Sequence, residues 1–268
     1  MEQKTFTKIF TNEKLPFLEL RYSNNTKHYK EHLHDTFSIG INIEGKSIYT
    51  NKTNKYDFDK GMIAIVNANT IHSCNPILET PNLYYMMYLD ENWCYGIQKS
   101  ICDEFDSFKS FPKDIILDIK LYDEFKTLCE NIFTNLSYIE KEDELIVFFT
   151  KLFSKYTEAS IMKIEDKSFD KITRFLNENY KENISLDELS SKFDLNPFYI
   201  IRLFKSNINM TPHAYLLNIK INRAKELLKK GFSIVDTALE CGFSDQSHFH
   251  RNFLKIVAST PKEYQKNF

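Results

Sequence analysis

The chain has 268 residues, a length that suits two domains better than one. Its residues are 42% hydrophobic and include only 6 Gly and 7 Pro, so we expect packed cores and no long flexible linker. There is no run of about 18 apolar residues and no hydrophobic signal core in Met1 to Phe10, which argues against a membrane partner and predicts a cytoplasmic protein. None of the 5 cysteines forms a C-x-x-C pair, and we interpret them as free thiols.

The net charge of −2 hides an asymmetry between the two ends of the chain. Residues 166–268 hold 16 Lys and Arg against 12 Asp and Glu, about +4, which leaves about −6 for the rest. A basic C-terminal part indicates a negatively charged partner at that end, although the excess is small.

Residues 1 to about 110 are predicted to form strands and turns. Short β-rich runs occur at Phe37–Ile43, Ser47–Thr50, Met62–Val66 and Tyr84–Leu89, and Gly45 and Gly61 mark turns beside them. Regularly spaced short strands are typical of a sandwich or barrel.

Apolar residues at helical spacing predict two amphipathic helices at about 117–137 and 143–157. We expect them to form a hairpin. Because their apolar stripes look wider than one hairpin can bury, we also expect this hairpin to make a homodimer.

Residues from about 166 onward predict seven helices, because the signals that begin and end helices are legible there. Two capping boxes begin at Ser185 and Thr260, and a proline follows the cap at Asn196 and at Thr211. Further caps are expected at Ser168, Ser233 and Ser244, and Gly231 and Gly242 are expected to end helices.

Two segments, Ser185 to Lys205 and Ser233 to Lys255, share one layout. Each predicts a short helix, a tight turn nine residues after its cap, and a second helix containing Arg-x-Phe, which is a helix-turn-helix. The second helix of such a unit enters the major groove of DNA. The predicted DNA contacts are Phe198, Ile201, Arg202 and Lys205 in the first unit and Gln246, Ser247, His250 and Arg251 in the second. The alternative is that Phe198 and Ile201 are core residues of an ordinary helical domain.

The stretch from Ile172 to Tyr264 closely resembles the AraC/XylS family of regulators. Small departures are Ser190 in place of a frequent Ala, Asn209 and Ala258 in place of frequent Gly, and Lys220 in place of Arg. The resemblance implies two helix-turn-helix units joined by a long helix, here Pro212 to Lys230. It is carried by Ile184-Ser185-Leu186-x-x-Leu189, Phe204-Lys205, Thr211-Pro212-x-x-Tyr215-Leu216, Ala224-x-x-Leu227-Leu228, Ser233-Ile234, Ala238-x-x-x-Gly242-Phe243-Ser244-Asp245-x-Ser247-x-Phe249-x-Arg251-x-Phe253 and Thr260-Pro261-x-x-Tyr264.

Residues 28 to 90 resemble a cupin sensor domain, through His32-x-His34, Gly45, Gly61 and His72. The three histidines are predicted to line an effector pocket, while metal ligation and a purely structural role stay open. Cupins usually have a glutamate near Ser38, which is missing here. Aromatic residues that could line the pocket are Tyr22, Phe37, Tyr49, Tyr56, Phe58, Tyr84, Tyr85, Tyr88 and Trp93.

We therefore predict an α+β protein with three parts. These are a cupin-like β-barrel or sandwich at 1–110 that senses an effector, a helical linker and dimerisation hairpin at 111–162, and an all-α DNA-binding domain at 163–268. The predicted function is an effector-controlled transcription regulator that binds double-stranded DNA, contacts RNA polymerase if it activates, and needs no metal or cofactor. It is predicted not to be an enzyme. The alternative is a metal-dependent cupin enzyme fused to a DNA-binding domain.

Overall fold

The computed structural model describes residues 5–77, 82–156 and 167–267. The chain divides into two compact units, Met1–Met162 and Lys163–Phe268. In the parts of the chain that the structure describes, no helix is long and apolar enough to cross a membrane.

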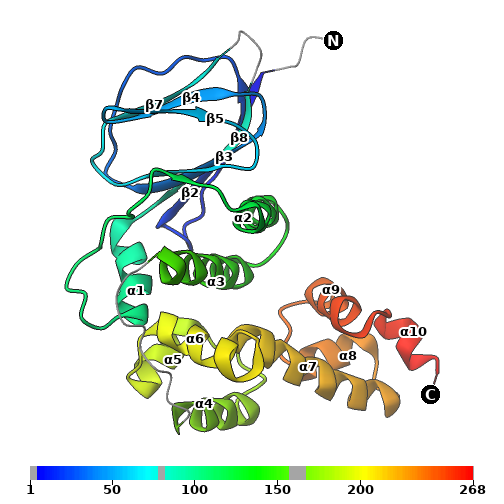
Figure 1. Ribbon diagram of the computed structural model, residues 1–268. Helices are drawn as coiled ribbons and strands as arrows, with labels where there is room; N and C mark the ends of the chain where they lie inside the picture. The colour runs from blue at the N-terminus through cyan, green and yellow to red at the C-terminus, as the bar shows by residue number, and fades with distance from the viewer. Residues whose placement is uncertain (1–4, 78–81, 157–166, 268) are drawn as a thin grey trace. The chain divides into compact units, whose positions relative to one another are not determined.

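The N-terminal unit contains two antiparallel sheets that face each other (Figure 1). The larger sheet has the order β1-β2-β8-β3-β6-β9 and the smaller sheet the order β5-β4-β7. The predicted sandwich is therefore confirmed. The strands are β1 (Phe6–Phe10), β2 (Leu18–Asn25), β3 (Phe37–Glu44), β4 (Ser47–Asn51), β5 (Asn54–Phe58), β6 (Ile63–Val66), β7 (His72–Pro76), β8 (Asn82–Leu89) and β9 (Ile115–Ile116).

A helix, α1 (Glu91–Ile101), follows β8 in a region where the sequence predicted only strands and turns, so that expectation is wrong. The carboxylate of Asp90 begins α1 by accepting hydrogen bonds from the backbone N–H groups of Asn92 and Trp93. Its buried face includes Cys94, Ile97 and Ile101.

The predicted hairpin is present as α2 (Ile119–Ile132) and α3 (Tyr138–Tyr156). It packs against the sandwich of its own chain. The Tyr122 hydroxyl donates to the Asn42 carbonyl oxygen at 2.6 Å. Phe153 also lies edge-on to Phe37 of β3, with ring centroids 5.7 Å apart. The apolar stripes are thus covered within the chain. The reasoning that they exceed what one chain can bury is wrong, and the dimer stays a prediction without it.

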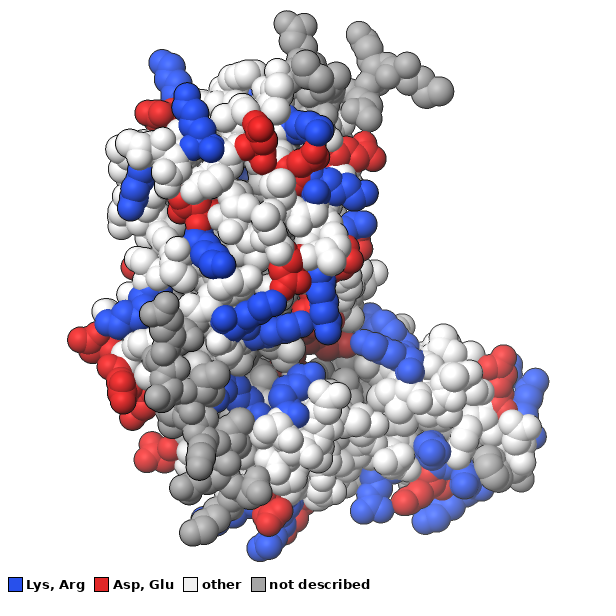
Figure 2. All heavy atoms as spheres, in the orientation of Figure 1, with Lys and Arg blue, Asp and Glu red and all other residues white. Residues whose placement is uncertain are grey.

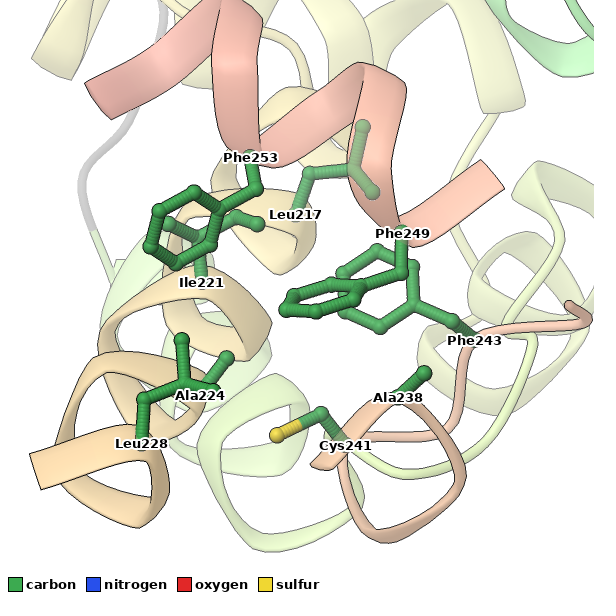
Figure 3. Packing of buried hydrophobic residues seen from close by; sticks show 9 residues of the cluster. All are labelled: Leu217, Ile221, Ala224, Leu228, Ala238, Cys241, Phe243, Phe249 and Phe253. Carbon is green, nitrogen blue, oxygen red and sulfur yellow. The ribbon is translucent and has the colours of Figure 1, made fainter. Parts of the chain in front are cut away.

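The described part of the C-terminal unit contains the seven expected helices. It holds two hydrophobic cores, one for each helix-turn-helix unit, and the long helix α7 contributes Leu216 to the first core and Leu217, Ile221, Ala224 and Leu228 to the second (Figure 3). The two units are therefore built on one shared helix. The helices are α4 (Lys167–Glu178), α5 (Leu186–Phe193), α6 (Pro197–Ile208), α7 (Pro212–Lys229), α8 (Ile234–Glu240), α9 (Gln246–Val257) and α10 (Pro261–Gln265).

Candidate functional site

The first helix-turn-helix unit is built from local signals in its sequence. Ser185 and Glu188 form a complete capping box at the start of α5. Asp194 ends that helix in the left-handed conformation, with φ 52° and ψ 48°. The Asn196 side chain then caps α6, whose first residue is Pro197. These signals set the turn between the two helices.

The inward face of α6 is as predicted, because Ile200, Leu203 and Phe204 belong to the first core. Two residues of the predicted outward face are buried. Ile201 is 1% exposed and Arg202 is 8% exposed, although neither belongs to that core cluster. Periodicity does place both residues away from that core, and their contact with DNA stays a prediction. Burial also lowers the pKa of the Arg202 guanidinium. Phe198 and Lys205 are half-buried.

The second unit presents its predicted residues openly. Gln246, Ser247, His250 and Arg251 are all exposed on α9. On the opposite face, Phe249 and Phe253 are fully buried and point toward α7 and α8 (Figure 3). This helix therefore combines an anchored apolar face with a polar face that is free to meet a partner.

The cap of α9 is Asp245, whose carboxylate accepts from the backbone N–H of His248 at 2.6 Å. The expectation that Ser244 is the cap is wrong by one residue, because its hydroxyl donates to Asp245 Oδ2 instead. Ser168 lies inside α4 and is not its cap. The caps at Ser233, Thr211 and Thr260 are confirmed.

A buried lysine joins the two helix-turn-helix units. Lys220 of α7 is 4% exposed, and its Nζ donates to the Gly242 carbonyl oxygen at 2.7 Å and to Asn183 Oδ1 at 3.4 Å. Gly242 lies in the turn of the second helix-turn-helix unit, whereas Asn183 precedes α5 of the first helix-turn-helix unit. Beside them, Lys181 Nζ pairs with Glu240 at 2.8 Å. These contacts fix the two units relative to each other.

Charge on the visible face of the molecule is mixed rather than sorted by sign. Figure 2 shows Lys and Arg side chains interspersed with Asp and Glu over that face. The exposed pairs Arg223–Glu226 and Lys181–Glu240 are examples in the C-terminal unit. Such pairs add no net charge, so the modest basic excess of this unit lies on its other Lys and Arg side chains.

The sandwich of the N-terminal unit contains a partly open cavity of about 210 Å³. Five of the predicted aromatic residues line it, whereas Tyr22, Phe37, Tyr56 and Trp93 do not. Its polar wall is formed by three residues that the sequence did not single out, Asn42, Ser47 and Asn82, and the amide Nδ2 of Asn42 donates to Ser47 Oγ at 3.1 Å. The five predicted aromatic residues that line it are Tyr49, Phe58, Tyr84, Tyr85 and Tyr88, and Tyr29, which was not predicted, lines it too.

The three predicted histidines lie together at one end of this cavity. The backbones of His32 and His72 pair through two hydrogen bonds of 3.0 and 2.9 Å, which places their rings 4.5 Å apart between centroids. The His34 ring lies 4.7 Å from that of His72 and 6.2 Å from that of His32. Burial lowers the pKa of His34 and lowers that of His72 to about 4.

These histidines do not form a metal-ligand set. Among the residues that the structure describes, no group of three or more His, Cys, Asp and Glu side chains is arranged to hold a metal ion. The cluster therefore gives no support to metal chemistry in this cavity.

Comparison with known proteins gives two domain matches. Residues 17–146 match the AraC-like ligand binding domain, and residues 189–267 match a helix-turn-helix domain. The HTH-type transcriptional regulator YbfI of Bacillus subtilis (strain 168) is 26% identical over 231 residues, which are 85% of this chain and 84% of that protein. The HTH-type transcriptional activator RhaS of Yersinia pestis bv. Antiqua (strain Angola) is 23% identical over 248 residues, 88% of each protein. Among solved structures, ToxT from Vibrio cholerae shows 16% identity and a TM-score of 0.41, and the match covers 93% of this chain and 98% of that chain.

Proposed function

This chain is an AraC-type transcription regulator with an N-terminal ligand-binding domain, and we propose that α9 reads base edges in a major groove of its operator. The observation that carries the proposal is the division of α9 into a fully buried face with Phe249 and Phe253 and an exposed polar face. On the exposed face, Arg251 can donate two hydrogen bonds to guanine and Gln246 can bond adenine. Ser247 and His250 add further groups that can bond bases or phosphates.

The first unit is proposed to enter the next major groove through α6. The helix between the two units, α7, has 18 residues and therefore spans about 27 Å at 1.5 Å per residue. One turn of DNA spans roughly 34 Å, so two helices held at its ends reach consecutive grooves if the duplex bends or the helices tilt. Phe198 and Lys205 are proposed as the first contacts. Ile201 and Arg202 contribute only if DNA binding exposes them.

Control is proposed to come from a small-molecule effector in the sandwich, near His32, His34 and His72. The cavity, the histidines beside it and the match to a ligand-binding domain support this role. A regulator needs no catalytic group, and its relatives YbfI and RhaS are named as transcriptional regulators. We therefore propose that the chain is not an enzyme. A homodimer, and contact with RNA polymerase if the protein activates, belong to the same proposal.

The base-reading role of α9 is tested with Arg251→Ala in the full-length protein. If Arg251 pairs with guanine, the variant should lose about 1–3 kcal/mol of binding free energy and relax sequence preference at that base. Lys205→Ala is the comparison, with a loss that is uniform across sequences and a salt slope reduced by about one unit, as for a phosphate contact. A base-resolved binding profile measures both. Wild-type affinity and preference in Arg251→Ala would contradict the placement of α9 in the groove.

A further inference from the structure

Two hollows of the N-terminal unit meet at a shared wall. The inner one is the cavity of about 210 Å³ inside the sandwich, and the outer one is an open cleft of about 800 Å³. Arg21, His32 and Tyr88 line both, His72 lines only the inner cavity, and His34 lines only the outer cleft. A ligand in the inner cavity can therefore touch Arg21, His32 and His72, and the His34 ring lies 4.7 Å behind that of His72.

The inner cavity carries an excess of groups that are or can become positive. Of the described residues that line it, none is Asp or Glu, whereas Arg21, Lys27, His32 and His72 all are potential cations. Its remaining lining is uncharged and includes Ile41, Val66, Met86 and the five aromatic side chains named above. Such a cavity favours a ligand with one negative group and an uncharged body.

Hydrogen bonds fix the three imidazoles in one tautomer. The Nδ1–H groups of His32, His34 and His72 donate to the carbonyl oxygens of Lys30, Thr36 and Thr70 at 2.9, 3.0 and 2.9 Å. A carbonyl oxygen only accepts, so Nδ1 carries the proton in each ring. Nε2 is then the nitrogen of each ring that meets a ligand, and it becomes a donor when the ring takes up a proton.

The pKa values of His34 and His72 are lowered mainly by burial, and the only carboxylates beside this wall are those of Glu13, Glu19, Asp35 and Asp90 among the described residues of the outer cleft. For His72, burial lowers the pKa most, and the neighbouring His34 and His32 lower it further. For His34, burial again lowers the pKa most, and the positive charges of His32 and Arg21 lower it further. Asp35 and the hydrogen bond to the Thr36 carbonyl oxygen raise it. A bound anion would relieve this repulsion between positive groups.

Arg21 is oriented toward this wall by two neighbours. Its guanidinium lies 4.6 Å over the Tyr88 ring, and its Nε donates to Glu19 Oε1 at 2.6 Å. Arg21 Nη1 is 3.5 Å from the Tyr88 hydroxyl. A guanidinium has five N–H groups, so it can hold a second oxyanion beside the Glu19 carboxylate.

We propose that the effector carries a compact oxyanion, a carboxylate or a phosphate, that binds Arg21 and the histidine cluster, with its uncharged body in the inner cavity. This inference rests on the proposed effector role of the N-terminal unit and names the class of ligand. The cavity is smaller than the roughly 300–1,000 Å³ of sites for drug-sized ligands, so the body is that of a small metabolite.

The test uses the full-length chain and three matched probes: benzoate, phenyl phosphate and the neutral benzamide. The melting temperature should rise saturably with benzoate or phenyl phosphate and stay unchanged with benzamide, and the stronger of the two anions tells carboxylate from phosphate. In Arg21→Gln the dissociation constant of the anion should rise at least about tenfold, because a charge-assisted hydrogen bond is lost. Arg21→Lys keeps the charge and checks that a weaker response is not a folding defect. Lys55→Gln, an exposed residue that lines neither hollow, is the control that should behave as wild type.

The outcomes separate the anion site from the broader proposal of an effector pocket that controls DNA binding. Equal stabilisation by benzamide and benzoate, or an unchanged response in Arg21→Gln, would overturn the anion site while leaving the effector pocket in place. The absence of any response to both anions would also overturn it. If the anions bind but the affinity for operator DNA stays constant, the anion site stands and effector control of DNA binding fails.

Discussion

Replacing Gly242 by alanine tests how closely the two helix-turn-helix units approach each other. Gly242 has φ +70°, and a Cβ built there lies 1.9 Å from the Lys181 carbonyl oxygen, whereas real Cβ atoms essentially never come within 3.0 Å of another atom. The Lys181 oxygen is a backbone atom, so the turn of the second helix-turn-helix unit must move at least 1.1 Å away from the first helix-turn-helix unit. Such overpacking costs about 1–3 kcal/mol. The left-handed backbone adds about 1–2 kcal/mol, so we expect a loss of about 2–5 kcal/mol in the free energy of unfolding.

Gly231, which also lies in the C-terminal unit, provides the matched control. Its φ is +85°, but nothing lies within 4 Å of a Cβ built on it. Gly231→Ala should therefore lose only the backbone cost of about 1–2 kcal/mol. The difference between the two variants isolates the contact of Gly242 with Lys181.

Urea unfolding of the full-length protein measures both variants. Far-UV circular dichroism follows the helices, while the single tryptophan, Trp93, reports on the N-terminal unit by fluorescence. Gly242→Ala should shift the dichroism transition and leave the fluorescence transition in place. Equal losses of unfolding free energy in Gly242→Ala and Gly231→Ala would refute the close approach of the two helix-turn-helix units.

Two further predictions concern buried cations and imidazoles. Lys220→Met should lose about 1–3 kcal/mol of stability by removing a charged donor to the Gly242 carbonyl oxygen, whereas Lys220→Arg should keep most of it; urea unfolding by dichroism compares them. The pKa of His72 falls from 6.5 to about 4 on folding, so between these values the unfolded chain binds the extra proton and stability falls as pH falls. Between pH 6.5 and 5 this loss should reach about 1.5 kcal/mol by Trp93 fluorescence, and His72→Gln should lack it.

The helices of the C-terminal unit could be predicted from sequence because their signals are local. Ser185, Asn196 and Thr211 each cap a helix within three residues of their own position. Two other predicted caps were wrong: Ser244 stands one residue before the true cap Asp245, and Ser168 lies inside α4. The departures from family glycine are consistent with the same local rule, because Asn209 and Ala258 both adopt positive φ, at 54° and 56°.

The N-terminal unit was less predictable because its order is not local. The strand β8 pairs with β2 across 57 to 71 positions of the chain and with β3 across 39 to 52 positions, and no local pattern encodes those pairings. The missed helix α1 did carry a signal, since Cys94, Ile97 and Ile101 recur at helical spacing after the cap at Asp90. The preceding apolar strand obscured it.

The faces of the two recognition helices could be predicted from helical periodicity. Periodicity separated the buried Phe249 and Phe253 from the exposed Arg251 correctly, because α9 has a core on one side only. In α6, the same reasoning placed Ile201 and Arg202 away from the first core, and neither residue belongs to that core cluster.

Selection of bound duplexes from a random-sequence pool by the full-length protein tests the central claim, sequence-specific DNA binding, most directly. We expect enrichment of a site with two base-specific segments about one helical turn apart, one for each recognition helix. The logarithm of the binding constant for that site should fall linearly with the logarithm of the salt concentration, since Lys and Arg displace counterions from phosphate. Failure to enrich any sequence, with no salt-dependent binding to any duplex in the pool, would contradict the account.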